Sequence, residues 1–158
     1  MEYNIIIASL FILFLPLLSF IFQLAIGKKI GEKSHFSALS IIGSTLILSG
    51  YIFYNIIIQH HHSINKSIDW ISFKSMDVPL GIHIDNITAI MLCVVSLISF
   101  LVHLYSTEYM KGDKRYTRYF GFLGLFTFSM NGIVLSDSLI MMYLFWELVG
   151  LSSFLLIG

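Results

Sequence analysis

The chain has 158 residues, of which 57% are hydrophobic and 11% are charged, and its mean hydropathy is +0.87. An average soluble domain carries about 25% charged residues, so the apolar excess of this chain has to face lipid rather than water. The net charge is zero, which leaves no strong positive field to attract nucleic acid. The composition therefore excludes an ordinary soluble domain and predicts an integral membrane protein whose partner is the lipid bilayer, with no nucleic-acid partner.

Five stretches are long and apolar enough to cross a membrane, which takes about 20 residues per helix. The first contains Pro16, which neighbouring helices can tolerate, and it lacks the basic start and the cleavage site of a signal peptide. We therefore expect it to remain as a helix. The predicted fold is an all-α multi-pass membrane protein, a single unit over 1–158, with about five transmembrane helices. These are about 3–27, 36–58, 86–107, 116–136 and 138–158.

The segment 59–85 separates the second and third expected helices and is mostly uncharged. Hydrophobic residues alternate along 78–84 with the period of a β-strand, and Ile68–Phe73 is a plausible partner strand. We expect a small β-hairpin in this outside loop. The three adjacent histidines at 60–62 have no cysteine or acidic residue beside them and do not converge on one ion, so we expect solvated loop and no metal site.

Basic residues are divided unevenly among the loops. Seven of the nine Lys and Arg residues lie in the loops 28–33 and 106–118, whereas Lys66 and Lys74 lie in the remaining loop. With five crossings, the two basic loops share one side of the membrane. The positive-inside rule then predicts that both are cytoplasmic, or face a mitochondrial matrix, and that the N-terminus lies outside. We favour a bacterial cytoplasmic membrane over the mitochondrial inner membrane.

Glu147 is the first candidate functional residue, because it is the single charged residue of 138–158. It lies ten residues after Asp137, about 15 Å into the helix and near the bilayer centre. A charge there costs roughly 2.5–3.5 kcal/mol on insertion scales, so such residues usually serve a function. A carboxyl that gains and loses a proton suits proton translocation. The alternative is a permanently protonated glutamate that only joins helices.

Neighbours on the same helical face favour an interior position for Glu147. Tyr143 lies one turn before it and Gly150 three residues after it. The Tyr143 hydroxyl is a candidate support for the carboxyl through a hydrogen bond, and Gly150 and Ser153 are small enough for close helix packing. Trp146 points away from this face, and we interpret it as a lipid or packing contact.

Small and polar residues also mark the fourth expected helix. Gly121 and Gly124 lie one turn apart and are followed by Gly132, a pattern typical of a close helix contact. Asn131 requires a hydrogen-bond partner if it lies inside the membrane. We interpret both features as helix packing rather than as part of a transport path.

His103 lies in the third expected helix, about one turn from its cytoplasmic end, with Ser96 and Ser99 on the same side. Histidine titrates near neutral pH, so a proton relay is one interpretation. A hydrogen-bonded anchor near the helix end is the other, and the more common one. Cys93 lies in the same apolar run, cannot form an intrachain disulfide and is given no role.

Motifs that bind nucleotides or redox groups are missing from the sequence. There is no G-x-G-x-x-G, no P-loop and no cysteine cluster for an iron–sulfur centre or haem. We therefore expect no cofactor in this chain.

The last expected helix carries a specific motif. From Met142 to Gly158 it reads M-Y-L-F-W-E-L-V-G-L-S-S-F-L-L-I-G. This resembles the W-E-x-V-G-x-x-S-[FY]-L-L-I-G signature of the antiporter-like, proton-pumping subunit L of NADH-quinone oxidoreductase (respiratory complex I), the counterpart of mitochondrial subunit 5. The resemblance runs from about Asp85 to Gly158, while 1–84 share only the layout of two helices and an outside hairpin. Upstream segments that resemble the family are Asp85-Asn86-Ile87-Thr88, His103-Leu104-Tyr105-Ser106, Tyr109-Met110 and Arg115 to Phe120.

The resemblance implies that Glu147 is the family's transmembrane glutamate, which pairs with a lysine on a later helix and modulates the protonation of that lysine. No expected helix of this chain contains a lysine, and chains of the family are much longer. We expect the N-terminal portion of such a subunit, either a fragment or a split chain. Its partners would be the missing C-terminal helices and other complex I membrane subunits, and the parent complex would hold NADH, FMN, iron–sulfur clusters and quinone.

The leading hypothesis is a proton-translocating subunit that couples quinone reduction elsewhere in the complex to proton transfer through Glu147. The family is similar to cation/proton antiporters, so a subunit of a sodium/proton antiporter is the alternative. Val149-Gly150 favours the respiratory subunit over the antiporter. A structural membrane subunit without an ion path is a further alternative, in which Glu147 only joins helices.

Overall fold

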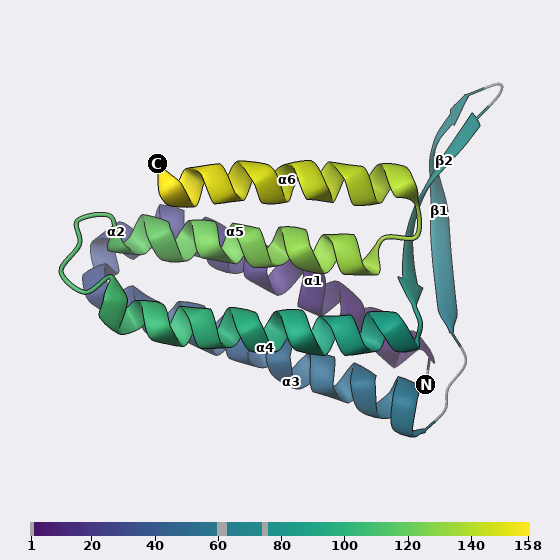
Figure 1. The fold of residues 1–158 in the computed structure, drawn as a ribbon, viewed down its shortest axis with the longest axis horizontal. Coiled ribbons are helices and arrows are strands. Elements are labelled where there is room, and N and C mark those ends of the chain that lie inside the picture. Colours follow the sequence, from purple (N-terminus) through teal and green to yellow (C-terminus); the bar gives the residue numbers. More distant parts are fainter. Residues whose placement is uncertain (1, 60–62, 74–75) are drawn as a thin grey trace.

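The computed structural model describes residues 2–59, 63–73 and 76–158, so the histidines at 60–62 lie outside the described residues. Figure 1 shows long helices lying side by side, with a two-stranded sheet across one end of the bundle. The elements in chain order are α1 (Glu2–Ala25), α2 (Gly27–Ile30), the 3₁₀ turn η1 (Gly31–Lys33), α3 (Ser34–Phe53), the π-helical turn η2 (Tyr54–Ile58), β1 (Ile64–Phe73), β2 (Met76–Ile84), α4 (Asn86–Tyr109), α5 (Tyr116–Leu135) and α6 (Leu139–Ile157).

The expected multi-pass helical fold with a small hairpin is confirmed. Four stretches of the described chain are long and apolar enough to cross a membrane, namely Glu2–Ala25, Ser34–Ile58, Asn86–Tyr109 and Leu139–Ile157. The fifth long helix, α5, has 20 residues and carries three glycines, a serine, two threonines and an asparagine. It lies in the middle of the bundle, between α4 and α6 (Figure 1). Its polar residues therefore face other helices instead of lipid.

Glycines allow α5 to approach α1 closely. A Cβ added at Gly124 would lie 3.0 Å from the carbonyl oxygen of Pro16, and one added at Gly121 would lie 3.4 Å from Cβ of Gln23. In lipid, helices associate by close packing and hydrogen bonds, because the hydrophobic effect does not drive them together. The two glycines supply that packing between α1 and α5.

A second α1–α5 contact replaces a hydrogen bond that Pro16 removes from the backbone of α1. Pro16 has no N–H, so the carbonyl of Ile12, four residues earlier, loses its helical donor. The side-chain amide of Asn131 on α5 donates to this carbonyl across 3.2 Å, and Asn131 is fully buried. The partner that Asn131 requires inside the membrane is therefore a carbonyl that the proline has freed.

The hairpin is fastened to the helix bundle in two places. β1 and β2 are antiparallel and pair Ile64 with Ile84, and β1 begins four residues before the expected strand. Both isoleucines are buried in an apolar cluster with residues of α1, η2 and α4. Ile82 forms a bridge with Ser136 in the α5–α6 turn. The hairpin thus joins the start of α4 to the start of α6 at what we call the hairpin end.

Side chains cap two helices at the hairpin end. The Asp85 carboxylate accepts the backbone N–H of Thr88 at 2.7 Å at the start of α4. This hydrogen bond lowers the pKa of Asp85, with a smaller contribution from His83 at 3.8 Å. The Ser138 hydroxyl accepts the N–H of Met141 at 3.3 Å and caps α6.

The opposite end, which we call the loop end, carries α2, η1 and the α4–α5 turn (Figure 1). Gly31 and Gly112 have φ angles of 69° and 84°, a left-handed conformation that glycine adopts without strain and that these tight turns require. Gln23 of α1 donates to the carbonyl of Ser34 at 2.8 Å and holds the two sides of the first turn together. Both basic segments of the sequence therefore lie at the same end of the bundle.

Candidate functional site

Glu147 lies near the middle of α6 and its side chain is exposed. α6 packs against α5 through another face, where the ring of Phe145 lies over Gly132 and makes an edge contact with Phe128 at a centroid distance of 5.5 Å. The glutamate faces away from α5. Among the described residues, its carboxyl is therefore not enclosed in a helix contact.

Two aromatic residues accompany Glu147 on α6. The hydroxyl of Tyr143, one turn earlier, interacts with the Glu147 carboxyl, as the spacing of the two residues predicts. Tyr143 is 56% exposed and Trp146 is 62% exposed, and their rings lie 6.1 Å apart. The carboxyl and the phenol therefore share an open side of this helix, and the Trp146 ring lies beside Tyr143, although the sequence predicts that it points away from this face.

The small residues that were expected to pack divide into two groups. Gly121 and Gly124 lie against α1, whereas a Cβ added at Gly150 would meet nothing within 4 Å. Ser153 is half-buried. The side of α6 that carries Glu147 and Gly150 thus has space for a helix that the described residues do not provide.

The position of Glu147 has an energetic consequence. A charged side chain near the centre of a membrane is stable only when it faces protein, water or an opposite charge. A carboxyl on the open side of α6 meets this condition when another helix covers that side. The Glu147 carboxylate would also raise the proton affinity of a cationic partner on such a helix, because a neighbouring negative charge favours the charged form of the cation.

His103 lies in a different place, fully buried between α4 and α5. Its Nδ1 lies 2.8 Å from the carbonyl of Ser99, and the ring of Phe120 lies 6.0 Å from the imidazole. Ser96 is also fully buried on the same side of α4, as the helical spacing predicts. α5 separates α4 from α6, so the structure does not bring His103 and Glu147 together (Figure 1).

Three polar residues near His103 were missed in the sequence. Thr127 of α5 lies 2.6 Å from the Ser99 hydroxyl, and Tyr119 of α5 lies 3.2 Å from the Ser106 hydroxyl. Ser106 follows His103 at i+3, so its spacing alone places it on the same side of α4. Thr127 and Tyr119 give no such local signal, because their partners lie on another helix.

Metal ligands do not gather in the part of the chain that the structure describes. There, no group of three His, Cys, Asp or Glu residues is arranged to hold a metal ion. Cys93 is a free thiol and is half-buried. The two candidate ionisable groups described above are a carboxyl on α6 and an imidazole on α4.

These features define a multi-pass membrane protein with a helical bundle, a hairpin at one end and an ionisable residue near the middle of an apolar helix. The family described as NADH-ubiquinone oxidoreductase (complex I), chain 5 N-terminus, matches residues 70–120. The NAD(P)H-quinone oxidoreductase chain 5 of Synechocystis is 41% identical over 131 residues, which cover 83% of this chain and 19% of the relative. The NADH-ubiquinone oxidoreductase chain 5 of Dictyostelium citrinum is 38% identical over 147 residues, with coverages of 92% and 22%.

The chain thus resembles the N-terminal part of chain 5 of complex I. Chain 5 is one of the antiporter-like membrane subunits. It spans about a fifth of the length of these curated relatives.

Two solved assemblies contain the same fold. In the Mrp complex from Dietzia, one chain superimposes with a TM-score of 0.74 and 23% identity, over 98% of this chain and 16% of that chain. In the membrane-bound sulfane sulfur reductase, an archaeal respiratory membrane complex, the TM-score is 0.74 at 17% identity, with coverages of 92% and 29%. At these identities the likeness concerns the fold.

Proposed function

We propose that this chain is the N-terminal portion of a proton-translocating membrane subunit of an NADH:quinone oxidoreductase. The observation that carries the proposal is the Glu147 carboxyl on the open side of α6, within a motif that resembles that of the family. The similarity to chain 5 relatives over most of this chain supports the same assignment. Other subunits of the complex would hold NADH, FMN, the iron–sulfur clusters and the quinone, and this chain would contribute a proton-carrying group.

In the proposed mechanism, Glu147 pairs with a cationic side chain on a helix that covers the open side of α6. While the two groups are paired, the Glu147 carboxylate raises the proton affinity of the cationic side chain, which keeps its proton. When the pair separates, that proton affinity falls and the cationic side chain releases the proton. Tyr143 orients the carboxyl. Gly150 and Ser153 leave space for the backbone of the covering helix. The covering helices belong to the remainder of the subunit and to other membrane subunits of the complex.

The test is Glu147→Gln in the assembled complex, with proton uptake into inverted membrane vesicles measured during NADH oxidation. Glutamine keeps the size of the side chain and one oxygen that accepts a hydrogen bond, but it does not titrate, so we expect normal assembly and strongly reduced pumping. Glu2→Gln, a carboxyl at the start of α1, is the matched control and should leave pumping unchanged. Normal pumping by Glu147→Gln would contradict the switch and favour a structural role for this residue.

A subunit of a sodium/proton antiporter is the second candidate. It is favoured by the superposition on a chain of the Mrp complex, which covers 98% of this chain. The two candidates differ in their energy source, because an antiporter exchanges sodium for protons without NADH. Exchange in vesicles that lack NADH, together with no effect of Glu147→Gln on NADH oxidation, would favour the antiporter.

We further propose a bacterial cytoplasmic membrane, with the N-terminus outside and the loops 28–33 and 106–118 in the cytoplasm. The gathering of both basic segments at the loop end supports this orientation. A cysteine introduced at Lys114, in a chain that carries Cys93→Ser, should react with a membrane-impermeant thiol reagent from the cytoplasmic side. A cysteine at Asn65, in β1, should react from the opposite side, and the reverse pattern would overturn the orientation.

A further inference from the structure

The side of α4 that packs into the bundle is polar, although the helix is long and apolar enough to cross a membrane. Ser96, Ser99, His103 and Ser106 recur every three or four residues and form one stripe along the helix. Ser96, His103 and Ser106 are fully buried, and the large residues on the opposite side of α4 are exposed. We call these four residues and their partners on α5, Thr127 and Tyr119, the α4–α5 polar seam.

Hydrogen-bond directions in the seam fix the tautomer of His103. The carbonyl of Ser99, 2.8 Å from Nδ1, can only accept a hydrogen bond, so Nδ1 carries the proton. In the neutral ring Nε2 is then an acceptor. This Nε2 atom is buried and has no hydrogen-bond partner within residues 2–59, 63–73 and 76–158. The imidazole therefore presents a free basic lone pair inside the protein.

Beyond His103 the seam continues toward the hairpin end as hydroxyl groups. Thr127 donates to the carbonyl of Leu123 at 3.0 Å, so the Ser99 hydroxyl is the donor in the 2.6 Å contact with Thr127. The Ser96 hydroxyl, about one turn further, is buried and lacks a hydrogen-bond partner in the described chain. Buried polar atoms of this kind are the usual sites of internal water. Water between them would connect the imidazole to the middle of the bundle.

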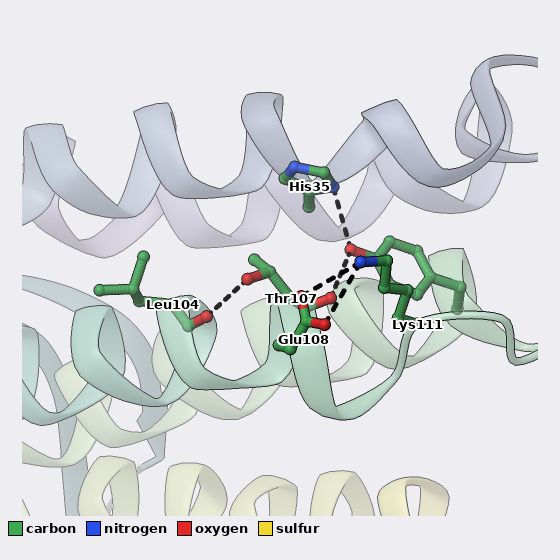
Figure 2. Close-up of polar contacts among 6 residues, drawn as sticks. His35, Leu104, Thr107, Glu108 and Lys111 are labelled. Atoms are coloured by element: carbon green, nitrogen blue, oxygen red, sulfur yellow. Dashed lines mark hydrogen bonds and ion pairs between the residues drawn. The ribbon is translucent and has the colours of Figure 1, made fainter.

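The seam continues toward the loop end through Ser106. Its hydroxyl donates to the carbonyl of Val102 at 2.7 Å, so Tyr119 is the donor in the 3.2 Å contact with Ser106. One residue later, the end of α4 borders a polar cavity of about 160 Å³. Figure 2 shows His35 of α3 facing Thr107, Glu108 and Lys111 across this region. The residues that line the cavity are His35, Thr107, Glu108, Lys111 and Tyr116.

The cavity provides groups that can collect protons from water. Glu108 and Lys111 are exposed and lie 3.3 Å apart, and Nδ1 of His35 lies 2.9 Å from the Tyr116 hydroxyl. The titratable or charged groups around this part of the seam are His35 from α3, Tyr116 and Tyr119 from α5, and Glu108 and Lys111 from the end of α4. His103 is the buried titratable group next along α4.

We propose that the α4–α5 polar seam is a proton path from the loop end of the bundle, in which His103 is the relay and the cavity beside His35 and Glu108 is the mouth. Hydronium on the mouth side gives a proton to Nε2. The imidazolium then gives up its Nδ1 proton to a water on the Ser99 side, which leaves a neutral ring with the proton on Nε2. A half turn of the ring presents the free nitrogen to the mouth side again and readies the relay for the next proton. The chemical balance is one proton in and one proton out, with water as donor and acceptor. This proposal rests on the proton-translocating function proposed above and assigns it a second pathway group, apart from Glu147.

The test is His103→Gln in the assembled complex. Glutamine can donate to the Ser99 carbonyl in place of Nδ1, but it cannot take up a proton. We expect the complex to assemble, NADH-driven proton uptake to fall by more than half, and the remaining rate to lose part of its dependence on pH. Ser129→Ala is the matched control, because Ser129 is equally buried and its one side-chain hydrogen bond within the described residues goes to the carbonyl of Leu125 in its own helix. Unchanged pumping and an unchanged pH profile in His103→Gln would overturn the proposal.

A second variant keeps the test decisive if His103→Gln does not assemble. The pair Ser99→Ala and Thr127→Val removes the hydroxyls beyond the relay with little change in volume, and should reduce pumping in the same way. If both variants are lost from the complex, the seam is a structural contact and the proposal is wrong. If Glu147→Gln stops pumping while His103→Gln does not, the path is wrong and the proposed function stands. If neither variant affects pumping, the proposed function itself fails.

Discussion

α5 and α6 lie side by side and are nearly equal in length, yet they occupy opposite environments. Twelve of the 20 residues of α5 are buried, compared with two of the 19 residues of α6. The buried helix is the one with glycines, hydroxyls and an asparagine, and the exposed helix is almost wholly apolar. In lipid, large apolar side chains are stable on the outside, while small and polar residues make the contacts between helices.

Glu147 is the exception in this comparison, because it is a charged residue on the apolar, exposed helix. Every polar side chain of α5 that is deeply buried faces another element of the bundle, whereas the carboxyl of Glu147 faces outward from α6. The comparison teaches that hydropathy separates lipid-facing helices from central ones, and that a charge on a lipid-facing helix marks a place where more protein is required.

We expect the largest loss of stability from Gly124→Val, which disrupts the close packing of the buried helix α5 against α1. A Cβ at this position already lies 3.0 Å from the Pro16 carbonyl and 3.4 Å from the Phe20 nitrogen, and these backbone atoms cannot turn aside. Overpacking of this kind costs about 1–3 kcal/mol. We expect a lower midpoint of thermal unfolding in detergent and less assembled complex.

Gly50→Val is the control for that variant, because a Cβ at Gly50, on the exposed side of α3, meets nothing within 4 Å. It introduces the same β-branched residue into a membrane-spanning helix without a clash. Equal loss of stability in the two variants would show that glycine matters through helix propensity and not through the α1–α5 contact.

A smaller effect is expected from Asn131→Leu, which removes the donor to the Ile12 carbonyl. Hydrogen bonds between membrane helices contribute about 0.6 kcal/mol on average, and a buried acceptor left without a partner adds to this, so we expect a loss of about 1 kcal/mol. The measurement is a double-mutant cycle with Pro16→Ala, followed by thermal unfolding. Alanine restores an N–H for Ile12, so Asn131→Leu should cost less in that background, and strictly additive effects would contradict the link.

Much of the fold could be predicted because the membrane imposes length and hydropathy on each helix. The long helices, the hairpin and the shared side of Ser96, Ser99 and His103 all follow from local patterns. Length alone does not separate α5 from α6, because both are long enough to cross a membrane; their hydropathy does, since only α6 is among the four apolar spans. That difference in hydropathy matches the neighbours they meet.

Contacts between distant residues account for the rest. The bond from Asn131 to Ile12 joins residues 119 positions apart, and the contact of Ser99 with Thr127 joins residues 28 positions apart. Pro16 predicts a free carbonyl at Ile12, but no local pattern identifies its donor. None of the described residues covers the open side of α6 at Glu147, so its pairing stays a prediction.

The attachment of the hairpin to the α5–α6 turn has a mechanical consequence. The bridge of Ile82 with Ser136 holds the start of α6 beside the sheet, and Asp137 lies against Gly81, where any larger side chain would overlap it. If α6 tilts, it pivots about this anchored end, so the displacement grows with distance along the helix. Glu147 lies eight residues from Leu139, about 12 Å along α6. A tilt of about 5° would move the carboxyl by roughly 1 Å, which is enough to turn a good hydrogen bond into a broken one.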